Sequence, residues 1–199
     1  MVDDGRIENV GPLSDGPSES ADLTICGHGL TAIPGLVDLH VHLCLDINRA
    51  GDPTDPTVPL LPSRASDLIA RMLHQARETV EGGVTTVRDL GAPGDAIFLV
   101  RHLVEEGLAK GPRIVASGPM ITRTGGHCWF IGEEADGPTA VCEAVRRNLK
   151  AGADVIKLMV TGGYLTRGTL PTQATYSVQE IRRAVAEARR SNVQTTVHA

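Results

Sequence analysis

The sequence predicts an α/β protein with a parallel sheet, either doubly wound or a (β/α)8 barrel. From Gly35 onward, short apolar segments bounded by turn residues alternate with longer segments whose apolar residues recur at helical spacing. Strands that alternate with helices of this length form parallel βαβ units. No Gly-x-Gly-x-x-Gly or Walker motif follows a predicted strand, which weakens a nucleotide-binding interpretation.

The predicted elements follow one another in a regular order along residues 35–199. Helices are recognised by apolar residues three or four positions apart, and most are followed by glycine. The last helix begins with a capping box, in which Glu180 follows Ser177 by three residues. Five strands are predicted, at Leu36–Leu43, Val84–Asp89, Arg113–Ser117, Asp154–Val160 and Val193–His198. Four helices are predicted, at Ser66–Glu81, Asp95–Glu106, Pro138–Lys150 and Ser177–Arg190.

Two other segments differ in composition from the rest of the chain. Residues 1–34 are rich in Gly, Pro, Ser and Asp, with short apolar pieces such as Leu23–Ile25. They predict two or three short strands in a unit separate from residues 35–199. The segment Asp46–Pro62 contains four prolines, which predicts a loop longer than a simple connection needs.

Composition excludes several classes of function. The net charge of −5 and the aromatic content of 3% argue against a nucleic-acid-binding surface. No apolar stretch approaches the roughly 18 residues of a membrane span, and the acidic start predicts no signal peptide. Four cysteines without a Cys-x-x-Cys pair predict free thiols in a reducing compartment, so the expected location is cytoplasmic.

The sharpest chemical signal lies in the predicted strand Leu36–Leu43. Side chains alternate along a strand, so Asp38, His40 and His42 share one face, and we expect the apolar face opposite to pack on helices. Two imidazoles at positions i and i+2 can hold one metal ion, and parallel α/β proteins place their chemistry at this end of a strand. The alternative is a polar strand end with two solvated histidines.

Two later strands carry residues that favour the metal interpretation. Lys157 interrupts an apolar strand, where a charged amine is costly unless it is paired, neutral or modified. The alternative for Lys157 is a lysine that snorkels or is salt-bridged inside a barrel. His198 ends the last predicted strand, although by itself a histidine there is more often satisfied or exposed. Together these residues from three strands predict one site at a common sheet end.

Four segments of the sequence resemble a known family. The segment Pro34–His42 resembles the opening motif of the amidohydrolase superfamily. The segments Gly82–Asp89, Gly111–Gly118 and Ile156–Gly163 resemble the imidazolonepropionase-like branch, which includes metal-dependent Xaa-Pro and Xaa-Arg dipeptidases. The resemblance extends over nearly the whole chain.

The resemblance implies a (β/α)8 barrel with a small β-sandwich, to which residues 1–34 would contribute. It implies that His40 and His42 bind a first metal ion, that carboxylated Lys157 bridges two ions, and that His198 binds the second. A metal-bound hydroxide would then attack the carbonyl carbon of an amide, dipeptide or cyclic amide substrate. The expected cofactor is one or two divalent ions, zinc first, with manganese, iron or nickel as alternatives.

Weaker candidates lie on loops at the same end of the predicted sheet. His127 could polarise the substrate carbonyl, although it is equally well explained as a loop histidine. Tyr164 and Arg167 could meet a substrate carboxylate, although solvated loop residues are the better explanation. We expect Asp89 to orient the strand ends.

The sequence also departs from the family pattern. A barrel needs eight strands and about 250 residues, so residues 35–199 correspond to its first half. The strand-six histidine and the strand-eight aspartate, which would serve as general base, have no counterpart in these residues. The chain is therefore expected to be either part of an amidohydrolase that needs a complementary half-barrel or an oligomer, or a non-catalytic interaction module.

We expect the 199-residue chain by itself to hydrolyse dipeptides and cyclic amides negligibly, because one metal lacks a ligand and the general base is missing. Steady-state assays of the purified chain with added zinc or manganese measure this. Appreciable metal-dependent turnover would refute the expectation.

Overall fold

The computed structural model describes residues 2–12, 21–46 and 61–199. The chain divides into two compact units, Met1–Pro34 and Gly35–Ala199. The loop predicted at Asp46–Pro62 lies almost entirely outside the described residues. Among the helices that the structure describes, none is long and apolar enough to cross a membrane.

The first unit contains a small hairpin. Strands β1 (Val2–Asp3) and β2 (Arg6–Ile7) pair in antiparallel orientation. The two residues between them, Asp4 and Gly5, both have positive φ, at 43° and 72°. Positive φ at both central residues is typical of the two-residue turns that match the twist of a hairpin. The assignment of this unit to a β-sandwich stays a prediction.

The first unit contains two short strands, as expected, but not every apolar piece in it forms one. The apolar piece Leu23–Ile25 forms no strand, and its two large apolar side chains are exposed. A short apolar run becomes a strand only where a neighbouring strand pairs with its backbone groups. The described part of this unit places no strand beside these residues.

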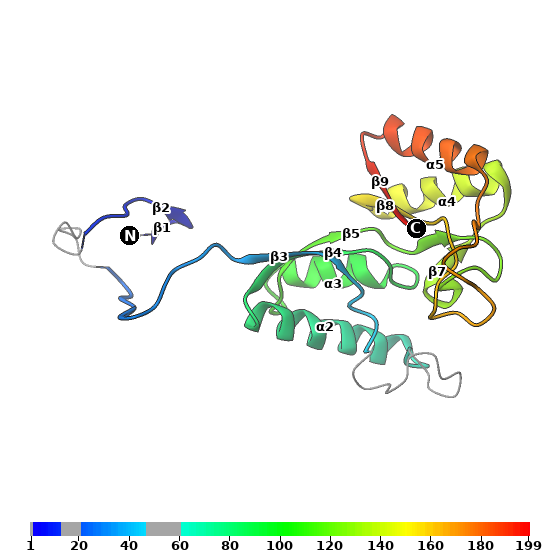
Figure 1. Ribbon diagram of the computed structural model, residues 1–199. Helices are drawn as coiled ribbons and strands as arrows, with labels where there is room; N and C mark the ends of the chain where they lie inside the picture. Colours follow the sequence, from blue (N-terminus) through cyan, green and yellow to red (C-terminus); the bar gives the residue numbers. More distant parts are fainter. Residues whose placement is uncertain (1, 13–20, 47–60) are drawn as a thin grey trace. The chain divides into compact units, whose positions relative to one another are not determined.

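The second unit contains two sheets with helices packed against them (Figure 1). All strand pairs within these two sheets are parallel. The first sheet has the order β3 (Leu36–Val41), β4 (Val84–Asp89) and β5 (Arg113–Ala116). The second has the order β7 (Gly132–Glu134), β6 (Met120–Thr122), β8 (Val155–Met159) and β9 (Gln194–His198). The helices are α2 (Ala65–Glu81), α3 (Ala96–Glu105), α4 (Gly137–Ala151) and α5 (Val178–Arg190), with a 3-10 turn η2 (Trp129–Ile131).

This arrangement confirms the predicted α/β class, and each predicted helix and strand of the second unit is present within one or two residues of its expected bounds. The capping box of α5 is also confirmed, because Ser177 Oγ accepts the Glu180 backbone N–H while Glu180 Oε2 accepts that of Ser177. Helix α4 ends at Gly152, whose φ of 98° suits glycine.

Three short elements were not predicted, namely β6, η2 and β7. Each has three residues, which is too short for a hydrophobic period to be recognised. Strand β6 is instead defined by its pairing with β7 and β8.

The two sheets of the second unit continue one another. A backbone hydrogen bond of 2.8 Å from Asp154 N–H to the Ala116 carbonyl links the end of β5 to the start of β8.

Two groups of buried apolar residues form the core of the second unit. The first lies between the β3–β5 sheet and helices α2 and α3, and includes Met72, Val87 and Ile97. The second lies between β8 and helices α4 and α5, and includes Ile156 and Leu158. Phe98 packs against both groups. This continuity holds the strand ends of the two sheets in fixed relative positions.

The apolar face of β3 departs from expectation. Val37 and Leu39 were expected to pack on helices, yet they are 57% and 58% exposed. The reason is topological: β3 is the edge strand of its sheet and pairs only with β4. Helices α2 and α3 instead pack against β4 and β5. Only after Val41 does the chain enter the core, where Leu43 is 4% exposed.

Candidate metal centre

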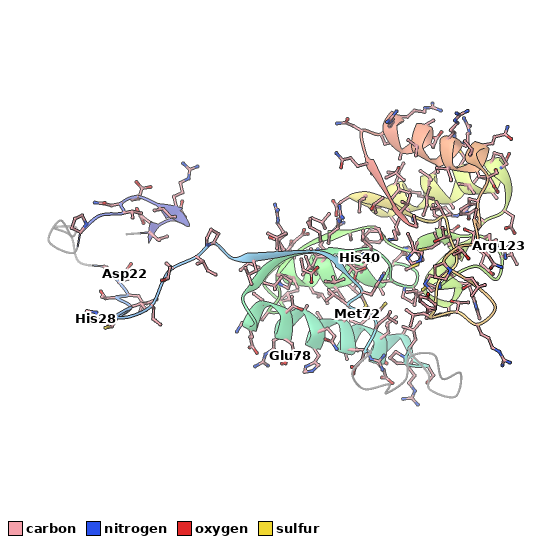
Figure 2. The ribbon with its side chains drawn as sticks, in the orientation of Figure 1. Asp22, His28, His40, Met72, Glu78 and Arg123 are labelled. Atoms are coloured by element: carbon pink, nitrogen blue, oxygen red, sulfur yellow. The ribbon has the colours of Figure 1, made fainter. Side chains whose placement is uncertain are left out.

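The C-terminal end of β3 brings two histidines together. Figure 2 labels His40 near the end of this strand, and His42 follows directly after it. The centroids of the two imidazole rings are 5.2 Å apart, with an angle of 68° between the ring planes. His42 Nδ1 lies 3.0 Å from the carbonyl oxygen of Gly91. Because a carbonyl only accepts, Nδ1 carries the proton and Nε2 is left unprotonated.

Burial shapes the protonation of both histidines. It lowers the pKa of His42 to about 4, opposed by the hydrogen bond to Gly91 and assisted by the positive charges of His40, Lys157 and His198. Burial is also the largest cause that lowers the pKa of His40. Both imidazoles are therefore neutral near pH 7, which is the form that binds a metal ion.

Asp89, the last residue of β4, is fully buried beside this pair. Its two carboxylate oxygens accept backbone N–H groups of Leu43, at 2.8 Å, and Gly91, at 3.0 Å. Burial raises the pKa of Asp89 to about 7, and these two hydrogen bonds act in the opposite direction. The expectation that Asp89 orients the strand ends is confirmed by these contacts.

Lys157 occupies the middle of β8, and its side chain is only 1% exposed. Burial lowers the pKa of its amine to about 8, and the Arg88 guanidinium acts in the same direction. Lys157 is paired with Thr196 of β9, and Met159 is paired with His198. Residues paired across parallel strands point to the same side, so Lys157 and His198 lie on one face of the sheet.

His198, at the end of β9, contacts a second histidine. Its ring centroid lies 4.8 Å from that of His127, with the planes tilted by 38°. His198 Nε2 is 3.0 Å from the Gly162 carbonyl oxygen, to which it donates. In the neutral tautomer of His198 that this contact favours, Nε2 is the donor and Nδ1 is the available nitrogen, the reverse of His42.

His127 sits on the loop between β6 and η2 and is 4% exposed. Its Nδ1 is buried and has no hydrogen-bond partner among the described residues. Burial lowers the pKa of His127 to about 4, and the charges of His198, His42 and Lys157 add to this effect. The ring packs directly on the backbone of Gly163, where a Cβ atom would overlap it.

Five of the seven candidate residues thus lie together. The charge of Lys157 acts on His40, His42 and His127, and the charge of His198 acts on the same three histidines. His40 lies near the end of β3 and His42 directly after it, Lys157 in the middle of β8, His198 at the end of β9, and His127 on the loop after β6. Tyr164 and Arg167 lie outside this group, because both are exposed on the loop that follows β8.

Sequence reasoning missed three further neighbours. Arg88 donates from Nε to the Leu39 carbonyl at 2.8 Å, and its charge lowers the pKa of both His40 and Lys157. Cys128 has positive φ, at 57°, and burial raises the pKa of its thiol to about 12. Arg88 lies in a segment that already carried the family resemblance, which was the available signal. No local pattern marked Cys128 or the packing of Gly163.

Within residues 2–12, 21–46 and 61–199, no three His, Cys, Asp or Glu side chains are close enough together to hold a metal ion. The histidines instead form two pairs, His40 with His42 and His127 with His198. Either pair would need a further donor. Lys157, which is not one of these four residue types, can supply oxygen donors only if its amine is carboxylated.

All four cysteines are free thiols, as predicted.

Comparison with known proteins decides the family. The amidohydrolase family profile matches residues 31–199. The chain belongs to the amidohydrolase family. Ochratoxinase from Aspergillus niger is 29% identical to this amidohydrolase chain over 224 residues, which cover 100% of the chain and 45% of that protein. Imidazolonepropionase from Micrococcus luteus is 33% identical over 112 residues, which cover 56% of the chain and 24% of that protein.

A solved structure extends the comparison to the fold. A Xaa-Pro dipeptidase with bound methionine in its active site has a TM-score of 0.70 and 29% identity, over 82% of the amidohydrolase chain and 42% of its own. The prediction of an incomplete (β/α)8 barrel is confirmed, because the structural neighbours are amidohydrolase barrels of which this chain matches only a part. The chain spans less than half the length of the curated relatives named here.

Proposed function

We propose that this chain carries the divalent-metal site of an amidohydrolase that cleaves an amide C–N bond in a dipeptide or cyclic amide. Membership of the family supports hydrolysis as the reaction class. The dipeptide alternative is supported by the likeness to a Xaa-Pro dipeptidase. The observation that carries the proposal is the way in which two histidines, His42 after β3 and His198 at the end of β9, are each anchored to a backbone carbonyl.

Each of these histidines uses one ring nitrogen on a backbone carbonyl and keeps the other available. His42 donates from Nδ1 to Gly91, and His198 donates from Nε2 to Gly162. Metal-binding histidines almost always donate their second ring N–H to a carbonyl, a carboxylate or water, because this fixes both tautomer and ring orientation. A merely solvated histidine has no need of such an anchor. We therefore assign Nε2 of His42 and Nδ1 of His198 as metal ligands.

Lys157 is the group that would connect His40 and His42 with His198. A neutral amine adds to CO2 to give a carbamate and releases one proton, and burial already lowers the pKa of this amine to about 8. Carbamate oxygens suit hard and borderline divalent ions. With Lys157 shared between two ions, His40 and His42 would hold one and His198 the other. We expect zinc first, with manganese, iron or nickel as alternatives.

When bound, such cations lower the pKa of a water molecule and polarise a carbonyl group. The protein residues supply the remaining functions of this half of the site. We propose that His127, whose ring lies against Gly163 and beside His198, donates a hydrogen bond to a substrate carbonyl; its packing supports this role. The exposed loop that follows β8 and contains Tyr164 and Arg167 would meet the rest of the substrate.

Replacing His40 and His42 together with alanine should abolish zinc binding. Both are proposed ligands of one ion, so we expect the affinity to fall by more than roughly 100-fold, the upper end of the effect of losing an outer-shell partner. Equilibrium dialysis of the 199-residue chain in bicarbonate buffer, followed by elemental analysis, gives the zinc content per chain.

The matched control replaces His74 and His102 with alanine, since both histidines are exposed on helices α2 and α3. This control should retain the zinc content of the wild type. Equal zinc in the His40/His42 variant and the wild type would overturn the proposal, as would an equal loss in the control.

A further inference from the structure

We propose that Asp89 is a positioning residue that fixes the tautomer and orientation of His42 through the backbone of Gly91, whose N–H it accepts and whose carbonyl the imidazole contacts. The inference rests on the proposed function in one respect, namely that His42 is a metal ligand. Asp89 itself would touch neither metal nor substrate.

The geometry is a closed chain of hydrogen bonds around His42. Leu43, the next residue after His42, donates its backbone N–H to Asp89 Oδ2 at 2.8 Å. Gly91 donates its backbone N–H to Asp89 Oδ1 at 3.0 Å. The carbonyl oxygen of Gly91 accepts from His42 Nδ1, also at 3.0 Å. One carboxylate therefore holds the backbone next to His42 and also the backbone N–H of Gly91, the residue whose carbonyl the imidazole ring contacts.

Two further contacts tighten this arrangement. The backbone N–H of Leu90 donates to the Val41 carbonyl at 3.0 Å, and Cys44 Sγ donates to the Gly91 carbonyl at 3.4 Å. Asp89, Leu90 and Cys44 are each no more than 1% exposed. Water therefore cannot easily replace a lost hydrogen bond, and an N–H left without a partner in such a place is unfavourable.

The position of Gly91 links the carboxylate to the imidazole ring. A Cβ atom at this position would lie 3.3 Å from two atoms of the His42 ring and would overlap the methyl group of Met120. The backbone of Gly91 therefore packs directly against the His42 ring. If the backbone of Gly91 turns once its N–H is released, its carbonyl no longer accepts from Nδ1, and the preference for one tautomer disappears.

A purely structural role for Asp89 predicts something different. In that case the carboxylate would only join the ends of β3 and β4, and its loss would lower stability without altering the imidazole. Asn148 offers a matched comparison. It is 3% exposed and donates from Nδ2 to the Pro119 carbonyl at 2.7 Å, on helix α4. Its loss should destabilise the fold through the same kind of buried hydrogen bond.

The experiment compares Asp89→Asn, Asn148→Ala and wild type in the metal-free 199-residue chain labelled with ¹⁵N-histidine. Long-range ¹H–¹⁵N NMR spectra report the tautomer of each imidazole. Wild type and Asn148→Ala should show His42 protonated at Nδ1 alone, whereas Asp89→Asn should show a mixture of tautomers. Zinc affinity should fall by about 10–100-fold in Asp89→Asn relative to Asn148→Ala.

An unchanged His42 signal in Asp89→Asn would overturn the inference, and so would an equal change in Asn148→Ala. If Asp89→Asn does not fold, Gly91→Ala tests the same link from its other end, and it should shift the His42 signal while Asp89 is intact. A changed tautomer in a chain whose wild type binds no zinc would support the positioning role and overturn the proposed metal site. The two hypotheses therefore fail separately.

Discussion

Replacing Lys157 with methionine should stabilise the metal-free chain by roughly 1–3 kcal/mol, in the range seen when buried ionic groups are replaced by apolar ones. The amine is 1% exposed, and burial lowers its pKa to about 8, so near pH 7 the fold still buries an ammonium group. Methionine has a similar length and no charge to desolvate. Urea denaturation in the presence of a chelator measures the free energy of unfolding.

The matched control is Lys150→Met on the surface of α4, which should change stability by less than about 0.5 kcal/mol. A Lys157→Met chain that is less stable than the wild type would show that the amine makes favourable contacts in the fold. The stabilised variant should also lose zinc, because methionine cannot form a carbamate. A gain in stability with a loss of binding is the expected signature of a functional residue.

Replacing Gly163 with alanine should destabilise the chain by roughly 1–3 kcal/mol, the usual cost of an added atom in a packed interior. A Cβ at this position would overlap the imidazole ring of His127, which is 4% exposed and has little room to move. The ring should therefore be displaced from its place beside His198. Denaturant unfolding measures the stability, and ¹⁵N-histidine NMR reports the two rings.

A double-mutant cycle shows whether the clash with His127 is the cause. Gly163→Ala should cost at least about 0.5 kcal/mol less in a His127→Ala background, because the overlapping ring is gone. The control Gly27→Ala, which has open space around its Cβ position, should be nearly neutral. Additive effects of Gly163→Ala and His127→Ala would exclude the proposed contact.

The local parts of the fold could be predicted because their signals lie close together in the sequence. The capping box needs only Ser177 and Glu180, and helix α4 needs only an apolar period and Gly152. The exposure of Val37 and Leu39 could not be predicted, because it depends on β3 being an edge strand. A period of two residues shows which side chains share a face but not what covers that face.

For the candidate site too, the residues on strands could be predicted from local patterns, whereas the positions of the loop residues could not. His40, His42, Lys157 and His198 could be selected because a polar residue in an apolar strand is unusual, and because parallel strands end at one edge of a sheet. The exposed positions of Tyr164 and Arg167 depend on how the loop after β8 folds back, for which the sequence carries no periodic signal.

The sequence by itself determined the order of strands and helices, the resemblance to the family, and which strand-end residues are candidates for the chemistry. Only the tertiary structure decided which nitrogen of each imidazole is available, since His42 and His198 are oriented by carbonyls 49 and 36 residues away. It alone placed both oxygens of Asp89 on the backbone around His42. Periodicity arises between residues a few positions apart, whereas hydrogen bonds across such distances exist only once the strands have packed together.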